Sequence, residues 1–162
     1  MIQREEAMTK RQLVLRSMVV VLLSGHAGTG GAGQEELAVP RCGGWGPESA
    51  YGRMFDPATV ETVRGEVVAI DLVNPRKGMA CGVCLTLRTE EGPVSVHLGP
   101  ECYINQQATR VEPHDAVHVT GSRVCLKGAP IIVATKLEKG DETLVLRNAR
   151  GVPAWSVGRR ER

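Results

Sequence analysis

A Cys-x-x-Cys pair and a nearby histidine are the residues of this sequence best suited to chemistry. Cys81 and Cys84 stand three apart, and His97 follows about one hairpin later. Thiolates and imidazoles are ligands that zinc and copper accept, and paired thiols can also carry out redox chemistry. A zinc site of this type usually has a second ligand pair at a fixed spacing, whereas the cysteines further along the chain stand alone. Leu85 follows Cys84 where covalent c-type haem attachment requires a histidine.

Strand geometry decides whether the two thiols can act together. Neighbouring residues of a strand point to opposite faces, so residues three apart also face opposite ways. Cys81 is in phase with three apolar residues, Val83, Leu85 and Leu87. We therefore expect Cys81 to be buried with the core and Cys84 to face outward, so that the pair neither chelates one metal nor forms a disulfide. A bulge at Gly82 is the alternative, because it would bring both sulfurs to one side, near Cys102 or His97.

The first 27 residues have the pattern of a secretory signal. A basic start precedes a short apolar run at 18–23, and Gly25-x-Ala27 offers a cleavage site. The run is shorter than the roughly 20 residues that a membrane span needs. We expect periplasmic export and a mature chain without a transmembrane span. An uncleaved N-terminal anchor is the alternative because Arg16 interrupts the pattern, and Met8 is an alternative start.

Export would place the five cysteines in an oxidising compartment, where cysteines tend to pair. An odd number leaves at least one thiol free or paired with another chain. We expect Cys42 to be the unpaired one, because it lies beside two glycines in a Gly-rich stretch. The sequence does not decide which of the other four cysteines pair.

Charge and motifs exclude several classes of function. Of the 20 basic and 18 acidic residues, four and two lie in the first 27, so the remainder is formally neutral. Nucleic-acid binders usually carry a basic stripe, whereas this chain has only a small Arg cluster at 159–162. Nucleic acid is therefore not an expected partner. The sequence has no GxSxG elbow, P-loop, HExxH or pair of carboxylates framed as acid and base, so we expect no enzyme activity, no catalytic residues and no cofactor.

The elements that would position these residues are strands rich in valine. We expect strands over 60–73, 81–89, 94–98, 116–126 and 131–138, and a short sixth over 142–147. Gly65 suggests a bulge or bend that lets the first strand serve two parts of a barrel. The polar segment before the fourth strand suits one helical turn and a loop. This order predicts an all-β fold, a small OB-like five- to six-stranded barrel with a short helical connection between strands 3 and 4. A small Ig-like sandwich is the alternative, but it needs about seven strands and a core Trp.

The predicted domain occupies 60–147. We expect 1–27 to be the signal peptide or anchor, 28–59 a flexible Gly-rich leader, and 148–162 a basic C-terminal tail.

One polar face of the second and third strands is the candidate binding site. Side chains of alternate residues form an outer patch, namely Cys84, Thr86, Arg88, Ser95 and His97. If the hairpin turns around Glu91-Gly92, Arg88 lies near Ser95 and Thr86 near His97. OB folds commonly bind ligands on this face, so we expect a ligand site there and no metal site. The expected partner is a protein or small molecule of the cell envelope. A solvated face without function is the alternative.

Four segments resemble a group of small exported bacterial OB-fold proteins, which are often labelled DNA-binding. They are YGRMFDPATVETVRGEVVAID (51–71), VHLGP with CYI (96–104), VTGSRV (119–124) and GVPAWSVGRR (151–160). The group is similar to the domain shared by the magnetosome proteins MamS and MamX and, more distantly, to the bacterial periplasmic OB-fold (BOF) family. The resemblance covers residues 44–160.

This resemblance implies a periplasmic or membrane-associated binding or accessory module rather than an enzyme. MamX-like proteins also carry haem-attachment motifs, which this chain lacks, so a role in electron transfer is not implied. A nucleic-acid-binding OB domain and a Cys/His metal-handling protein are the alternative functions.

Overall fold

The structure, a computed structural model, describes residues 42–156. The strands are β1 (Val60–Val73), β2 (Gly82–Thr89), β3 (Gly92–Pro100), β4 (Ala116–Leu126), β5 (Ala129–Lys139) and β6 (Glu142–Val145). A single helical turn, α1 (Glu101–Ile104), follows β3, and short 3-10 turns lie at Gly52–Met54, Pro57–Thr59 and Ala154–Ser156. None of the helices in this part of the chain is long and apolar enough to cross a membrane.

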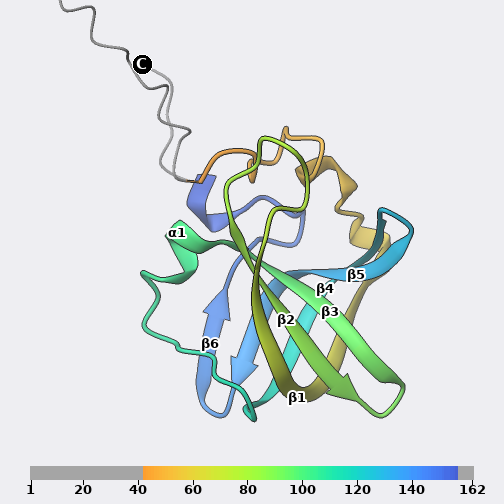
Figure 1. Ribbon diagram of the computed structural model, residues 1–162, viewed down its shortest axis with the longest axis vertical. Helices are drawn as coiled ribbons and strands as arrows, with labels where there is room; N and C mark the ends of the chain where they lie inside the picture. The colour runs from red at the N-terminus through yellow and green to blue at the C-terminus, as the bar shows by residue number, and fades with distance from the viewer. Residues whose placement is uncertain (1–41, 157–162) are drawn as a thin grey trace, which may run out of the picture. The chain divides into compact units, whose positions relative to one another are not determined.

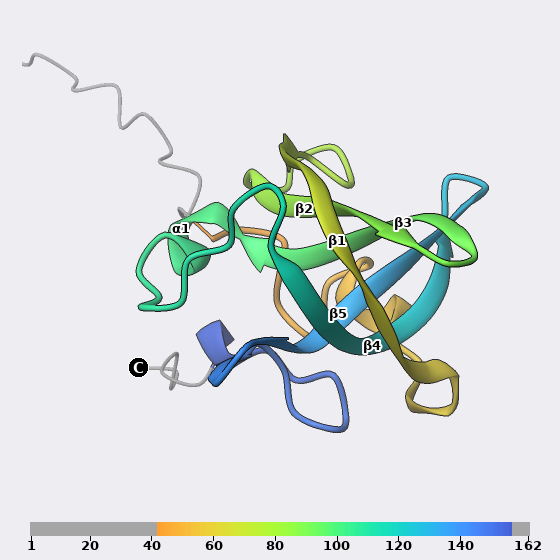
Figure 2. The same cartoon turned by 90° about the horizontal axis from the view of Figure 1, so that it is seen from below.

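The six strands form one sheet that closes on itself. Their order is β3-β2-β1-β4-β5-β6, and β3 also pairs with β5 in parallel, so five strands make a ring with β6 at the edge of β5 (Figure 1). Seen from below, the strands curl around a common interior (Figure 2). The predicted all-β fold with a short helical connection between β3 and β4 is confirmed.

The long first strand serves two neighbours, as predicted. Its first half, up to Glu66, pairs with β4, and its second half, from Glu66, pairs with β2. The irregularity in register lies between Val67 and Ala69, just beyond the glycine expected to cause it. Gly65 has a different role, because a side chain there would meet the Arg88 carbonyl oxygen at 2.7 Å. The glycine lets the two strands approach closely where β1 changes partner.

The interior of the ring holds the main core. Its buried residues come from all six strands and from Leu146, which follows β6 directly. Val and Leu are the most frequent residues of this core, because their side chains pack well on the buried face of a strand. The apolar residues of β2 belong to this cluster, namely Val83, Leu85 and Leu87.

A second apolar cluster lies outside the ring and includes the segment before β1. Trp45 and Tyr51 are 1% and 2% exposed and belong to a cluster with Ile131 and Val133 of β5. The prediction of a flexible leader is therefore wrong for 42–59, because two large aromatic side chains fix this segment on the strands. The remaining leader residues, 28–41, and the predicted signal, 1–27, lie outside the described residues.

The segment after β6 also packs against the strands. Trp155 is half-buried, and its Nε1 donates a hydrogen bond to the backbone oxygen of Trp45 at 2.9 Å. The two ends of the described chain therefore meet, as Figure 1 shows by the orange and dark blue segments. The expected tail is wrong for 148–156, and residues 157–162 lie outside the described part.

Candidate functional site

The two cysteines of the Cys-x-x-Cys pair have different surroundings, but the expected assignment is wrong. Cys84 is 7% exposed, whereas Cys81 is exposed, with its Sγ 3.6 Å from Asn74 Oδ1. Cys81 lies just before β2, so the alternation of the strand does not extend to it. Cys84 lies opposite the core face, as predicted, but that face is covered here instead of reaching solvent.

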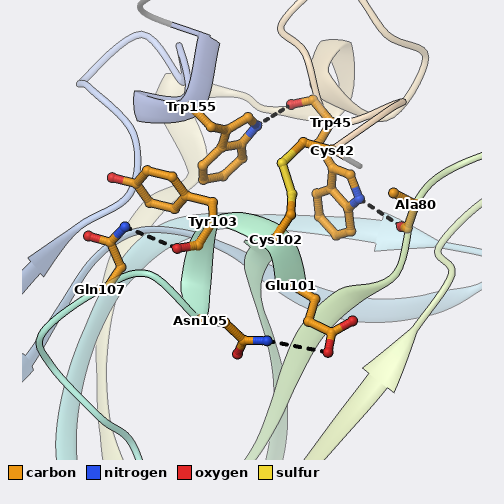
Figure 3. The surroundings of a disulfide bond; sticks show 9 residues. All are labelled: Cys42, Trp45, Ala80, Glu101, Cys102, Tyr103, Asn105, Gln107 and Trp155. Atoms are coloured by element: carbon orange, nitrogen blue, oxygen red, sulfur yellow. Dashed lines mark hydrogen bonds between the residues drawn. A yellow bond between two sulfur atoms is a disulfide. The ribbon is translucent and has the colours of Figure 1, made fainter. Parts of the chain in front are cut away.

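Trp45 is one of the side chains that cover this face of β2. Its position explains why residue 82 of the Cys-x-x-Cys motif is a glycine. A methyl group at Gly82 would overlap the Trp45 ring. The indole Nε1 also donates a hydrogen bond to the Ala80 backbone oxygen at 2.9 Å (Figure 3). On the neighbouring strand, a methyl group at Gly99 would overlap the Trp155 ring in the same way. Because Gly82 and Gly99 have no side chain, the rings of Trp45 and Trp155 can pack directly on the backbone of β2 and β3. Gly82 is therefore required for packing.

His97 lies under the same cover. It pairs with Cys84 across β2 and β3 and is 5% exposed. A hydrogen bond of 2.9 Å joins its Nδ1 to the Tyr51 hydroxyl, and the two rings stack with centroids 5.9 Å apart. Burial lowers the pKa of His97 to about 4, and the positive charge of Arg147 contributes to this shift. His97 is therefore neutral at pH 7, and burial likewise raises the pKa of Tyr51 above its usual value.

Arg147 is a buried cation close to His97 and Tyr51. Its Nη1 donates to the backbone oxygens of Leu98, at 2.9 Å, and of Ala134. The guanidinium also lies 4.8 Å from the centre of the Trp155 ring. Burial lowers its pKa to about 10, so it stays charged at pH 7. Within residues 42–156 it has no carboxylate partner, and carbonyl dipoles and the aromatic face stabilise the charge instead.

The structure keeps the five predicted site residues on one face but divides them. The pairs are Cys84 with His97, Thr86 with Ser95, and Arg88 with Pro93, so the register differs from the prediction by two residues. A shift of two preserves the face. Thr86 and Ser95 are half-buried and Arg88 is exposed. The expectation of one solvent-exposed patch is therefore wrong for Cys84 and His97.

Two surface hollows lie at the end of this face where the hairpin turn joins β2 and β3. The larger, about 660 Å³, is lined by residues 61–64 of β1, residues 89–91 of the β2–β3 turn and Arg123. The smaller, about 300 Å³, is lined by Arg88 and by residues of β1 and β4. Arg88 donates to Glu66 at 2.8 Å, and Arg123 also pairs with a glutamate, Glu61. The surface around the hairpin thus carries charges of both signs.

The cysteine pairing differs from the expectation. Cys42 is not the unpaired cysteine but forms a disulfide with Cys102 in α1, with Cα atoms 5.9 Å apart (Figure 3). That separation is ordinary for a disulfide. Cys81, Cys84 and Cys125 are the free thiols among the described residues. No group of three or more His, Cys, Asp or Glu side chains gathers within residues 42–156. The β2–β3 pairing does have an irregularity in register, but it lies between Val83 and Cys84, and Cys81 and Cys84 still differ in exposure.

The sequence patterns did not identify the side chains that surround Cys84 and His97. Trp45, Tyr51, Arg147 and Trp155 all lie outside the strands or at the domain boundary. A signal was present, because both tryptophans of the chain stand in segments that otherwise read as linker and tail.

The buried neutral His97 predicts a pH dependence of stability. An unfolded histidine has a pKa near 6.5, whereas the folded side chain has a pKa of about 4. Between these values the unfolded state binds more protons, so falling pH favours unfolding. The stabilisation associated with neutral His97 is fully present above about pH 6.5. As the pH falls toward 4, the free energy of unfolding decreases by about 3 kcal/mol in total.

Chemical denaturation at a series of pH values from about 7 to about 4.5 measures this slope. The variant His97→Gln is expected to lose most of the slope, and the matched variant of an exposed histidine, His114→Gln, is expected to retain it. Equal slopes in His97→Gln and the parent chain would contradict the buried position of His97.

A model of the MamS/MamX magnetosome protein family matches residues 59–144, which is more than half of the chain. A search of curated proteins finds no match. The matched range contains Cys84 and His97, but the side chains that cover them come from the segments on either side.

Proposed function

Because the chain belongs to the MamS/MamX magnetosome protein family, we propose that it is a non-enzymatic accessory module that binds a ligand in the cell envelope. Membership of a magnetosome family supports an accessory role. The observation that carries the proposal of binding is the open end of the β2–β3 face, where exposed Arg88 borders a hollow of mixed charge.

The state of the reactive side chains supports a role without catalysis. Burial raises the pKa of the Cys84 thiol to about 11, with Asp71 contributing, so that the thiol stays protonated at neutral pH. A protonated thiol is neither a nucleophile nor a good metal ligand. His97, its neighbour across the strands, is neutral and hydrogen-bonded to Tyr51. Both groups are occupied in packing rather than presented to a substrate.

The proposed binding face is the half of β2 and β3 near the hairpin turn, where side chains reach the solvent. Thr86, Arg88 and Ser95 lie in this half of the two strands, and residues 89–91 of the turn line the larger hollow. Both carboxylates and guanidinium groups line this hollow, which suits a polar segment of a partner protein. We therefore propose a protein partner whose charged side chains pair with both signs on this surface.

The position of the aromatic residues argues against nucleic acid as the ligand. Binding of single strands depends on exposed aromatic platforms and a basic groove. The chain has five aromatic residues, and all of them pack in the two apolar clusters: Trp45, Tyr51, Phe55, Tyr103 and Trp155. The hairpin end of the face therefore offers no aromatic platform.

Affinity capture with the full chain from a cell-envelope fraction tests the proposal. A protein retained by the parent chain should be lost with Arg88→Glu, which reverses the charge of the exposed arginine at the hairpin end of the face. It should be retained with Arg53→Glu, a matched reversal of an exposed arginine in the segment before β1. Equal retention by both variants would contradict the proposed face. Oligonucleotide binding with a steep salt dependence would instead favour a nucleic-acid-binding module.

Export remains part of the proposal and rests on the sequence of residues 1–27. Fractionation of the native host checks it. We expect a processed or anchored form in the cell envelope, and full-length precursor confined to the cytosol would contradict export.

A further inference from the structure

The second half of β1 is a sheet edge without a partner among the described residues. Beyond Glu66 the strand is no longer paired with β4. The last backbone bonds on that side join Val67 to Asp115 and to His114. From Ala69 to Val73 the strand pairs only with β2, and Val68 lies in the irregularity between Val67 and Ala69. An unpaired strand edge presents a row of N–H and C=O groups to which another strand can bond.

This edge is also apolar. Val68, Ile70 and Leu72 are 40%, 37% and 58% exposed, and they account for three of the five large apolar side chains exposed within residues 42–156. Ile70 and Leu72 pair with Leu85 and Val83 of β2, so they continue the apolar side of the sheet to its edge. Natural edges are usually protected by charges or proline. Asp71 is the only charged residue between 67 and 73.

We propose that this edge is the interface between two copies of the chain, which pair β1 with β1 antiparallel about a twofold axis at Ile70. In this register Ile70 lies opposite its own copy, and Leu72 lies opposite Val68 of the other copy. Asp71 then lies opposite Ala69 of the other copy. Moving the axis by one residue to Asp71 would set two carboxylates directly opposite each other, which is destabilising. The edge is thus self-complementary in the register centred on Ile70.

The charges at the two ends of the strand support a second copy as the occupant. Arg76 and Lys77 are exposed in the turn after β1, whereas Glu112 is exposed in the loop that bonds to the strand at Val67. Antiparallel pairing sets the end of one strand against the beginning of the other. It therefore brings the basic turn of each copy toward the acidic loop of its partner. A twofold interface makes every such contact twice.

Sedimentation equilibrium of the full chain tests this proposal. We expect a concentration-dependent dimer, because an interface of one strand pair lies at the small end of specific interfaces. Leu72→Lys should raise the dissociation constant by about 100-fold, since each of two symmetric sites loses about tenfold. Val145→Lys is the matched control, because Val145 is 56% exposed on β6, and it should leave the constant unchanged.

Charge exchange and cross-linking define the register. Lys77→Glu and Glu112→Lys should each weaken the dimer, and the double variant should restore it. Ile70→Cys, in a chain with Cys81 and Cys125 replaced by serine, should form a disulfide-linked dimer on oxidation, because residues directly opposite lie about 5 Å apart. Val145→Cys in the same background should not. A monomer at all concentrations, or a dimer unaffected by Leu72→Lys, would overturn the proposal.

Discussion

Replacing Cys42 and Cys102 together by serine is expected to lower the free energy of unfolding by about 4 kcal/mol. The disulfide joins residues 60 apart in the sequence, so it removes much of the freedom of the unfolded chain. It also fixes the start of the segment that covers β2. Because folded domains are stable by only about 5–15 kcal/mol, this loss is a large share of the total. Urea denaturation, followed by tryptophan fluorescence, measures it.

The control is Cys81→Ser, which removes an exposed free thiol and should change the free energy of unfolding by less than about 0.5 kcal/mol. A reducing agent added to the parent chain should reproduce the effect of the double substitution. Equal stability of the double variant and the parent under non-reducing conditions would show that the disulfide does not stabilise this segment.

Replacing Trp45 by alanine is expected to lower the free energy of unfolding by about 3–5 kcal/mol. The side chain is 1% exposed, rests on Gly82 and donates a hydrogen bond to Ala80. Its removal leaves a cavity between the covering segment and β2, and also exposes an unpaired carbonyl group. Thermal or urea unfolding of the variant measures the loss.

Two further variants separate packing from the general effect of a smaller side chain. Val145→Ala truncates an exposed residue and should be nearly neutral. Gly82→Ala leaves Trp45 in place but adds a methyl group where the ring lies, so it should also destabilise. If Trp45→Ala cost less than about 1 kcal/mol, the segment would not be a fixed part of the domain.

The strands could be predicted from the sequence because their pattern is local. Alternation of apolar residues around Val83, Leu85 and Leu87 sets their faces, and clusters of turn residues set their ends. The hairpin register failed because the turn is tighter than expected. Gly92, with φ of 114°, already belongs to β3 and pairs with Thr89. A local error in one turn moved both predicted cross-strand pairs, Arg88 with Ser95 and Thr86 with His97, by two residues.

The candidate site could not be predicted because its cover depends on contacts distant in sequence. Tyr51 and His97 are 46 residues apart, and Trp45 and Trp155 are 110 apart. Glycine and proline around Trp45 resemble a linker, and nothing local shows that its indole fits over Gly82. Strand alternation gave the correct face for Cys84, but it cannot state whether that face meets solvent or another segment.

Residues 42–55 cover Cys84 and His97 on the outer face of β2 and β3. The labelling rate of each free cysteine in the folded full chain, read by mass spectrometry, tests this cover most directly. We expect Cys81 and Cys125 to react rapidly and Cys84 to be protected, because it is buried and its pKa is raised to about 11. Trp45→Ala should increase the Cys84 rate selectively. Labelling of Cys84 in the parent chain as fast as that of Cys81 would contradict the claim.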